Sequence, residues 1–245
     1  MEPVPPLRLR AALRRMASLA WYRERLAGVD LDHAAWEDLP TMAVDDLRAA
    51  IAARPPDGGF RHPDVVRILA GPVPVPLTNR DLNSAAPTVA MALRRSGISS
   101  DLAVDLCLPF DRGGAGWWLV DALTYLGCRV WPAGAGADNG TGQLAIVPGE
   151  APGASRGRTV LTAGPPDADL WLHPIGGVLA ARCVNGGRVH PLDELATFEV
   201  AAGELVVSNL DRQALPTLRF RTGWRVSLVE RSCTCGALHY FEPAG

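Results

Sequence analysis

Lysine is missing from this chain. All 24 of its basic residues are arginines, set against 26 acidic residues. Without an ε-amino group the protein cannot form a lysine Schiff base, and it cannot place a lysine on an acyl-phosphate transition state. The abundance of alanine, glycine, proline and arginine is typical of a GC-rich genome, so base composition is sufficient to explain the missing lysine. The chemical exclusion holds whatever its cause.

Long apolar runs and a strong charge bias are also missing. No segment approaches the roughly 20 consecutive apolar residues that span a bilayer, and the first six residues lack the basic-then-apolar order of a signal peptide. The formal net charge of -2 gives no reason to expect nucleic acid or an anionic membrane as a partner. With 48% hydrophobic residues over 245 positions, the sequence predicts a globular cytoplasmic protein with one large domain or two small ones.

The cysteines that are present suggest a metal site. Their number, five, is odd, and four of the potential ligands fall into two close pairs, Cys183 with His190 and Cys233 with Cys235. Three thiolates and one imidazole are a set that Zn²⁺ takes in closed tetrahedral sites, which are structural. The alternative is that the cysteines are buried as small apolar residues and the histidine lies on the surface. The paired spacing favours zinc, and a closed site leaves no position for a reactive water.

Helical periodicity and capping residues organise the first hundred residues. We expect helices at 7–26, 45–52 and 78–95, and a short strand at 65–69. Thr78 supplies a helix-capping side chain, and Gly97 is suited to ending the same helix. Pro72, Pro74 and Pro76 exclude a central strand between the 65–69 strand and this helix.

The order of elements then changes to strand, turn, helix, strand. Residues 101–108 are strand-like, a glycine-rich turn follows at 110–116, a helix is expected at 117–126, and a further strand at 127–132. This order predicts a parallel α/β layer. Beyond residue 166 short β-type runs dominate, and they indicate a β-rich region.

Four segments resemble the phenylacetate-CoA ligase family of adenylate-forming enzymes. The most specific runs from Gly203-Glu-Leu-Val through Pro216-x-x-Arg-Phe-Arg-Thr to Cys233-x-Cys-Gly. The others are Tyr22-Arg-Glu-Arg-Leu-Ala-Gly-Val with Leu39-Pro-Thr and Asp46-Leu-Arg, Thr78-x-x-Asp-Leu through Gly97-Ile, and Leu108-Pro-Phe-Asp-Arg-Gly-Gly-Ala-Gly with Leu126-Gly-Cys-Arg-Val-Trp-Pro. Some members of that family bind zinc, and the resemblance places the ligands at Cys183, His190, Cys233 and Cys235.

The resemblance implies an α/β fold similar to a reduced amino-terminal domain of the adenylate-forming enzymes. In this reading residues 1–134 form a helical amino-terminal region and an α/β subdomain. Residues 135–165 are a shortened, loop-rich connection, because a long middle segment of the family is expected to be missing there. Residues 166–245 form a β-rich zinc-binding subdomain, and the family's lid domain with its catalytic lysine is expected to be absent.

Several departures from the family pattern concern the nucleotide. The phosphate loop is expected between the 65–69 strand and Thr78, but the sequence there is Gly71-Pro-Val-Pro-Val-Pro-Leu, and proline has no N–H to offer a phosphate oxygen. Trp224 stands where the family has its ribose-binding aspartate, and His173 stands near the position of an acidic residue of the nucleotide motif. ATP is therefore not an expected ligand.

Four residues are weak catalytic candidates. Asp111 lies in the glycine-rich turn, which could line an acyl pocket or be a plain turn between strand and helix. His173 could act as an acid or base, although no triad partner is identifiable from spacing. Arg219 and Arg221 are expected on one face of a strand, where they could hold a carboxylate or phosphate or pair structurally with Glu204; we favour the pairing.

Two functions are compatible with these observations. The first is an accessory or binding protein for an aryl or acyl intermediate or for a partner enzyme, in specialised metabolism, built on a zinc-stabilised ligase scaffold that has lost adenylation. The second is an enzyme of altered chemistry that acts on a preformed acyl thioester or adenylate in a retained acyl pocket. The substrate, the pathway and homodimerisation stay open.

Overall fold

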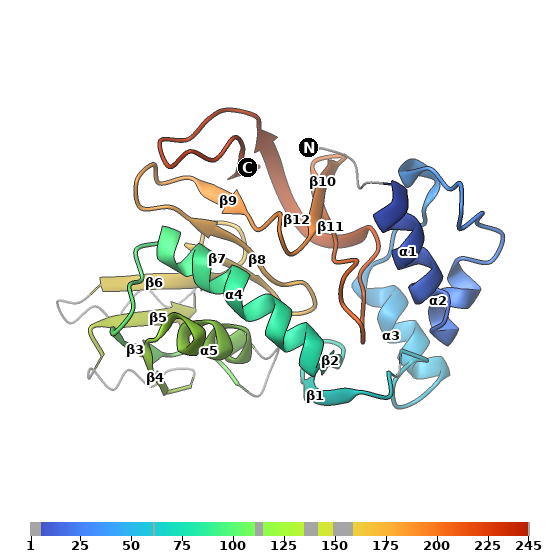
Figure 1. Ribbon diagram of the computed structural model, residues 1–245, viewed down its shortest axis with the longest axis horizontal. Helices are drawn as coiled ribbons and strands as arrows, with labels where there is room; N and C mark the ends of the chain where they lie inside the picture. Colours follow the sequence, from blue (N-terminus) through green and yellow to red (C-terminus); the bar gives the residue numbers. More distant parts are fainter. Residues whose placement is uncertain (1–5, 61, 111–114, 135–141, 149–158, 245) are drawn as a thin grey trace.

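One sheet of eleven strands crosses the whole molecule (Figure 1). The computed structural model describes residues 6–60, 62–110, 115–134, 142–148 and 159–244. The order of the strands in the sheet is β10-β11-β12-β13-β9-β8-β7-β6-β5-β3-β4, and β1 and β2 form a separate two-stranded sheet. No helix in these ranges is long and apolar enough to cross a membrane.

Strands β3 to β7 form the parallel half of the sheet, as the strand-helix-strand order predicted. Helices α4 and α5 cover one of its faces and share an apolar core with it. Parallel sheets need such cover because their strands are apolar on both faces. The elements of this half are β3 (Ala103–Leu106), α5 (Ala115–Leu126), β4 (Arg129–Pro132), β5 (Leu144–Pro148), β6 (Thr159–Gly164) and β7 (Leu170–His173), with α4 (Asn79–Arg95) packed beside α5.

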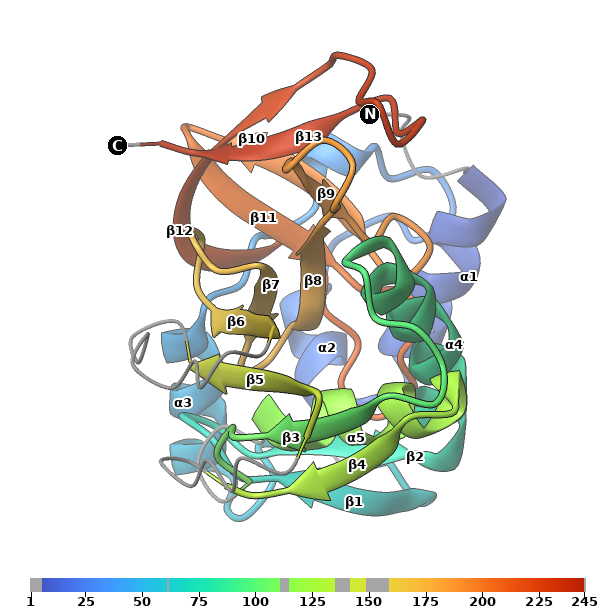
Figure 2. The same cartoon turned by 90° about the vertical axis from the view of Figure 1, so that its left-hand side faces the viewer.

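The remaining strands pair in antiparallel fashion and form the β-rich half, which Figure 2 shows above the parallel strands. Strand β7 joins the two halves, because it pairs parallel with β6 and antiparallel with β8. Strand β13 pairs with both β12 and β9. The elements are β8 (Gly177–Arg182), β9 (Val189–Pro191), β10 (Thr197–Ala201), β11 (Glu204–Ser208), β12 (Phe220–Val229) and β13 (Tyr240–Pro243).

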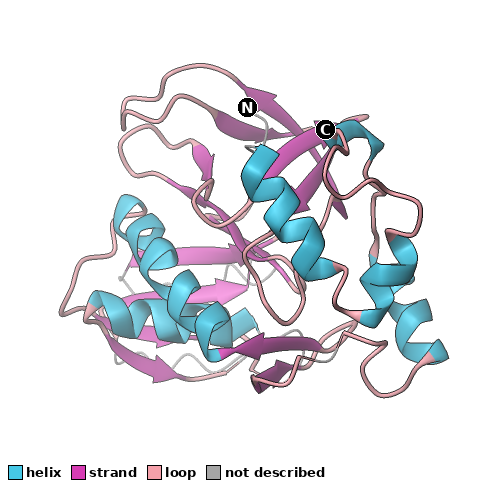
Figure 3. Cartoon of the chain, turned by 45° about the vertical axis from the view of Figure 1, so that its right-hand side comes forward, coloured by secondary structure: helices cyan, strands magenta, loops and turns pink. Residues whose placement is uncertain are grey.

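Three helices at the other end of the molecule from β4 form a second core (Figures 1 and 3). They pack on the loop before β12 and on its first residue, Phe220, which is fully buried. Met42 pairs with Phe220 in an isolated bridge, and the hydroxyl of Tyr22 donates to the carbonyl of Pro216. The elements here are α1 (Pro6–Met16), α2 (Ala20–Arg25), the 3₁₀ helix η1 (Trp36–Asp38), α3 (Val44–Ala53), β1 (Val65–Leu69) and β2 (Val75–Thr78).

Most local expectations are confirmed, and three differ. The helix at 78–95 begins at the Thr78 cap, and Gly97 follows it with φ +89°. The single helix expected over 7–26 is two helices, α1 and α2. The two β-type runs before and after Gly223 form one strand, β12.

The third difference lies in the loop-rich connection at 135–165. Its two apolar pieces form β5 and β6, which lie inside the parallel half of the sheet rather than in loops. Strands of this kind are difficult to predict from sequence, because each apolar run is only four or five residues long and is flanked by glycine and proline. How the chain divides into subdomains stays a prediction.

Candidate functional site

The two predicted ligand pairs come together in space. Cys183 follows β8, His190 lies within β9, and Cys233 and Cys235 lie in the connection between β12 and β13. One potential ligand atom of each residue lies within 4.8 Å of all the others. The antiparallel pairing of β13 with β9 brings the two connections together, since it places Phe241 opposite Val189. The cluster could therefore hold a metal ion.

Two of the separations between ligand atoms match those of a tetrahedral site. Ligands about 2.0–2.3 Å from a tetrahedral zinc ion lie about 3.3–3.8 Å from one another. The sulfur atoms of Cys183 and Cys233 are 3.7 Å apart, and the sulfur of Cys235 is 3.3 Å from Nε2 of His190. The residues thus fit a closed site with three sulfur ligands and one nitrogen ligand.

Two glycine-containing turns allow this close approach. Gly186 lies against Cys233, so that a Cβ atom on Gly186 would stand only 2.5 Å from the cysteine sulfur. The turn is closed by the N–H of Gly187, which donates to the carbonyl of Cys183 over 2.9 Å. In the second turn the N–H of Gly236 donates to the carbonyl of Cys233, and Gly236 has φ +91°. Glycine adopts such positive φ without strain.

A second layer of contacts orients the imidazole of His190. Its Nδ1 lies 2.8 Å from the carbonyl oxygen of His239, so this nitrogen carries the proton and donates it. That tautomer leaves the lone pair of Nε2 directed to a metal. The ring of His239 is itself held by Asp193, whose Oδ2 lies 2.8 Å from Nε2. No sequence pattern indicated this contact between Asp193 and His239.

The thiols differ in their acidity in the metal-free protein. The backbone N–H of Cys235, followed by the side chains of Cys235, His190 and Cys183, lowers the pKa of Cys233 to about 6 against the opposing effect of burial. Burial raises the pKa of Cys235. A thiol with a lowered pKa offers a thiolate near neutral pH, and the thiolate is the form that binds metal.

His173 lies at the end of β7 and is 5% exposed. Its Nδ1 accepts the backbone N–H groups of Ile175 and Gly176 over 3.2 and 3.1 Å. Burial lowers the pKa of His173 to about 4, although a backbone hydrogen bond with Thr222 opposes the shift. The ring is therefore neutral at physiological pH and serves as an acceptor for the turn between β7 and β8.

The two arginines near the start of β12 have separate carboxylate partners. Nε of Arg221 lies 2.9 Å from Glu204, the pairing that the sequence predicted. Nε of Arg219 lies 2.9 Å from Glu199, and the same guanidinium donates to the carbonyl of Leu39. Arg219 precedes β12 and has φ +45°, so the alternation from which we expected a common face does not extend to it.

The residues that stand at the nucleotide motifs of the resembling family pack against other parts of the protein. Trp224 lies against His173, with ring centroids 5.2 Å apart, and its ring also meets that of Trp171 edge to face. Pro76 belongs to β2, opposite Ile68 of β1. The predicted turn residue Asp111 lies outside the described residues, whereas Phe110 is in edge-to-face contact with Trp117.

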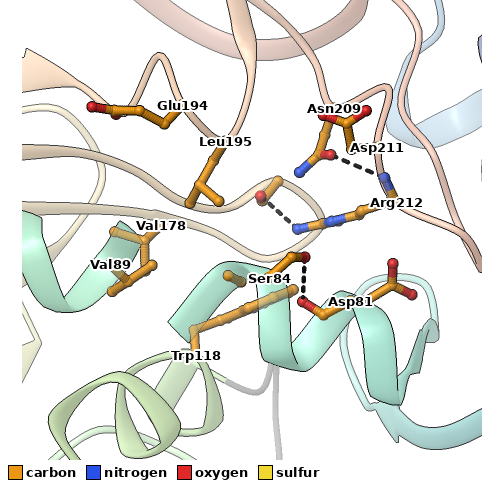
Figure 4. A pocket seen from close by; sticks show the side chains of 12 residues that line it. Asp81, Ser84, Val89, Trp118, Val178, Glu194, Leu195, Asn209, Asp211 and Arg212 are labelled. Carbon is orange, nitrogen blue, oxygen red and sulfur yellow. Dashed lines mark hydrogen bonds between the residues drawn. The ribbon is translucent and has the colours of Figure 1, made fainter. Parts of the chain in front are cut away.

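A cavity of about 80 Å³ lies between α4, α5 and the turn after β7 (Figure 4). Its walls include Val89, Trp118 and Arg212, and the guanidinium of Arg212 lies 4.8 Å from the centre of the Trp118 ring. Arg212 is 6% exposed and donates to the carbonyls of Ile175 and Gly176 over 2.6 and 2.7 Å. Burial lowers its pKa to about 10, so it stays charged at neutral pH. No sequence pattern singled out this residue, because both of its partners are backbone groups more than 30 positions away.

Asp81 connects the start of α4 to the segment that holds Arg212. One carboxylate oxygen accepts the N–H of Gln213 over 2.7 Å, and the other accepts the N–H of Thr78 over 2.9 Å. The carboxylate of Asp81, which completes the capping box of α4 with Thr78, thus also orders a loop 132 residues away.

The sequence matches no protein-family model and no curated protein. Solved structures do match. A 2-hydroxyisobutyryl-CoA ligase in complex with 2-HIB-AMP and CoA in the thioesterification state matches with a TM-score of 0.79 and 17% identity, over 97% of this chain and 66% of the ligase chain. An open conformation of that ligase, also with 2-HIB-AMP and CoA, matches with a TM-score of 0.80 and 16% identity, over 97% of this chain and 67% of the ligase. The chain therefore has the fold of an adenylate-forming CoA ligase over about two thirds of that enzyme's length.

Proposed function

We propose that this protein is a zinc-stabilised member of the phenylacetate-CoA ligase-like proteins that does not carry out ATP-dependent adenylation. It acts as an accessory or binding protein for an aryl or acyl intermediate, or for a partner enzyme, in specialised metabolism. The observation that carries the proposal is the packing of Trp224 on His173, because these two residues stand where the resembling family has nucleotide-binding carboxylates.

The expected phosphate position has few hydrogen-bond donors to offer, and its buried cation is already engaged. Both observations support the loss of adenylation. A transferring phosphoryl group needs preorganised donors or cations. The segment before α4 contains Pro74 and Pro76, which have no N–H, and Pro76 lies within the ladder of β1 and β2. The nearest buried cation of this region, Arg212, already donates to Ile175 and Gly176.

The space near these elements also weighs against a nucleotide or a large acyl group. Pockets for ligands of drug size are about 300–1,000 Å³ in volume. The cavity beside Trp118 and Arg212 is about 80 Å³. The alternative function, an enzyme that acts on a preformed acyl thioester or adenylate, needs a wider acyl pocket than this one. Arg219 and Arg221 are each bound to a glutamate, so they are not poised to receive a substrate carboxylate.

The metal assignment rests on the four-residue cluster and on the tautomer of His190. Zinc is the ion that prefers a closed tetrahedral set of three thiolates and one imidazole. In such a site it stabilises the fold and offers no open position to a substrate. The chain's own residues supply every feature needed: the ligands, the oriented imidazole, and the glycine turns that let the sulfur atoms meet.

The proposal is tested by three measurements on the purified protein. Metal content is measured by mass spectrometry of the elements, with Cys235→Ser as control; we expect one zinc per chain and a loss of zinc in the variant. ATP binding is followed by calorimetry, and pyrophosphate release is followed with a panel of aryl and acyl acids. Release of pyrophosphate with any of these acids would show that the protein is a ligase and that the proposal is wrong.

A further inference from the structure

A second cavity opens directly beside the metal cluster. Its volume is about 390 Å³, and two of the four ligand residues, Cys235 and His190, line it. The remaining walls come from the segment after β9, from the end of α4 and from the residues that follow Cys235. They include Arg95, Asp193, Glu194, Leu238 and His239. The cavity is thus wide enough to admit a small molecule to one face of the cluster.

The three sulfur ligands differ in their access to this space. Cys183 is only 2% exposed and does not line the cavity. Cys233 is half-buried, and its sulfur is covered by Gly186 on one side and faces the sulfur of Cys183, 3.7 Å away, on another. Cys235 is the one sulfur ligand among the lining residues. A reagent that enters from the cavity therefore meets Cys235 first.

The charges around the cavity are paired. Asp193 lies 2.8 Å from the imidazole of His239, and Glu194 lies 4.0 Å from the guanidinium of Arg95. These charged groups already have partners, so the described lining offers no free charged side chain to select a cation or an anion. Leu238 is 73% exposed and adds apolar surface. Such a space suits a small uncharged reagent, and hydrogen peroxide belongs to that class.

We propose that Cys235 is a modification site through which a peroxide opens the metal centre. The proposal rests on the metal-binding role given above. The thiolate sulfur of Cys235 attacks one oxygen of hydrogen peroxide, an S–O bond forms, and the O–O bond breaks. Sulfur is oxidised to sulfenic acid, and the peroxide is reduced to hydroxide and the sulfenic oxygen. A second thiolate of the cluster then attacks the oxidised sulfur, expels hydroxide and forms a disulfide.

The consequence for the protein is the loss of a cross-link between two parts of the sheet. A sulfenic acid or disulfide no longer offers a thiolate, so the site loses its hold on the ion. The β8–β9 side and the β12–β13 side then keep the pairing of Phe241 with Val189 and contacts such as the ion pair of Arg188 with Glu242, but they lose the metal that holds all four ligands together. Oxidation of one accessible sulfur would therefore loosen the connection between β12 and β13.

The test uses the zinc-loaded full chain and hydrogen peroxide. Dimedone traps sulfenic acid, peptide mass spectrometry locates the adduct, and a chromogenic chelator reports the released zinc. We expect the first adduct on Cys235 and zinc release that follows the same time course. Leu238→Trp, which narrows the cavity, should slow both processes severalfold. Val184→Trp is the matched control, because Val184 is 64% exposed and follows Cys183 but does not line the cavity; it should leave both rates unchanged.

Two outcomes would overturn the inference while leaving the metal site intact. One is a first adduct on Cys183 or Cys233. The other is an equal slowing by Val184→Trp and Leu238→Trp. A purified protein that contains no zinc and takes up none would instead contradict the proposed metal centre itself, so the two failures are distinguishable.

Discussion

Nε2 of His190 and the sulfur of Cys235 lie 3.3 Å apart although 45 residues separate them in the chain. A metal bound by both closes a loop of that length. A cross-link over a loop of about 50 residues stabilises a fold by roughly 4 kcal/mol in chain-entropy terms.

We therefore expect zinc removal by a chelator to lower the free energy of unfolding by about that amount, and Tm by roughly 8–16 °C. Calorimetry of the protein with and without chelator measures the effect. Cys235→Ser should match the chelated protein and should not respond to further chelator. An unchanged Tm after verified zinc loss would contradict the cross-link.

Gly186→Ala should weaken zinc binding, because the added methyl carbon would stand 2.5 Å from the sulfur of Cys233. Competition with a chelator of known affinity measures the change. Gly187→Ala is a suitable comparison, since Gly187 has φ +64° and a Cβ there meets nothing within 4 Å. That variant should lose about 1 kcal/mol of stability from backbone strain and keep its zinc affinity. Equal affinities for the two variants would argue against close packing of the turn on the metal cluster.

His173 should make stability depend on pH. Burial lowers its pKa to about 4 in the folded protein, below the ordinary value of 6.5. Between these values the unfolded chain binds the proton and the folded chain does not, so stability is complete above pH 6.5 and is lost as pH falls toward 4. The loss amounts to about 3 kcal/mol.

Urea unfolding at pH 7, 6, 5 and 4 measures this dependence in the parent protein and in two variants. His173→Asn keeps an acceptor for the N–H groups of Ile175 and Gly176 but does not titrate, so it should flatten the pH dependence. His173→Leu removes the acceptor and should destabilise the protein at every pH. A pH profile of His173→Asn that matches the parent's would assign the dependence to other groups.

Arg212→Met should destabilise the fold by about 2–5 kcal/mol, because it leaves the buried carbonyls of Ile175 and Gly176 without donors. Urea unfolding at neutral pH measures the loss. Arg225→Met is the control, since Arg225 is exposed and donates to a single carbonyl, that of Ala202; its cost should stay within about 0.5 kcal/mol. Similar costs for both variants would show that the buried contacts of Arg212 are not special.

The features that could be predicted from the sequence are those that depend on residues close together in the chain. Thr78 and Gly97 delimit α4 because a capping side chain and a glycine with positive φ act within one helical turn. The four candidate metal ligands could be named because each pair lies within eight positions and the residue types are rare. Neither inference needed knowledge of the three-dimensional arrangement.

The features that sequence could not supply depend on pairs of distant groups. The guanidinium of Arg212 donates to carbonyls 36 and 37 residues away. Every residue type has a backbone carbonyl, so the sequence does not indicate this contact. Asp193 meets His239 across 46 residues, in the connections that follow β9 and precede β13, two strands whose register was unknown. The expectation that Arg219 shares a strand face with Arg221 was wrong for a local reason. The φ of +45° at Arg219 interrupts the alternation of side chains that a strand pattern assumes.

The pairing of β13 with β9 has a consequence for how the chain assembles as it is synthesised. Every strand from β3 to β9 finds at least one partner that precedes it or follows it closely in the chain. Strand β13 also pairs with its neighbour in the chain, β12, but its second pairing must reach back to β9 across some 50 residues. Pairings of high sequence separation form late, since loop closure opposes them. The candidate metal ligands on the two sides of that pairing therefore meet late in folding, and a nascent chain in which β13 has not yet formed would carry a nearly finished sheet with one edge of β9 still open.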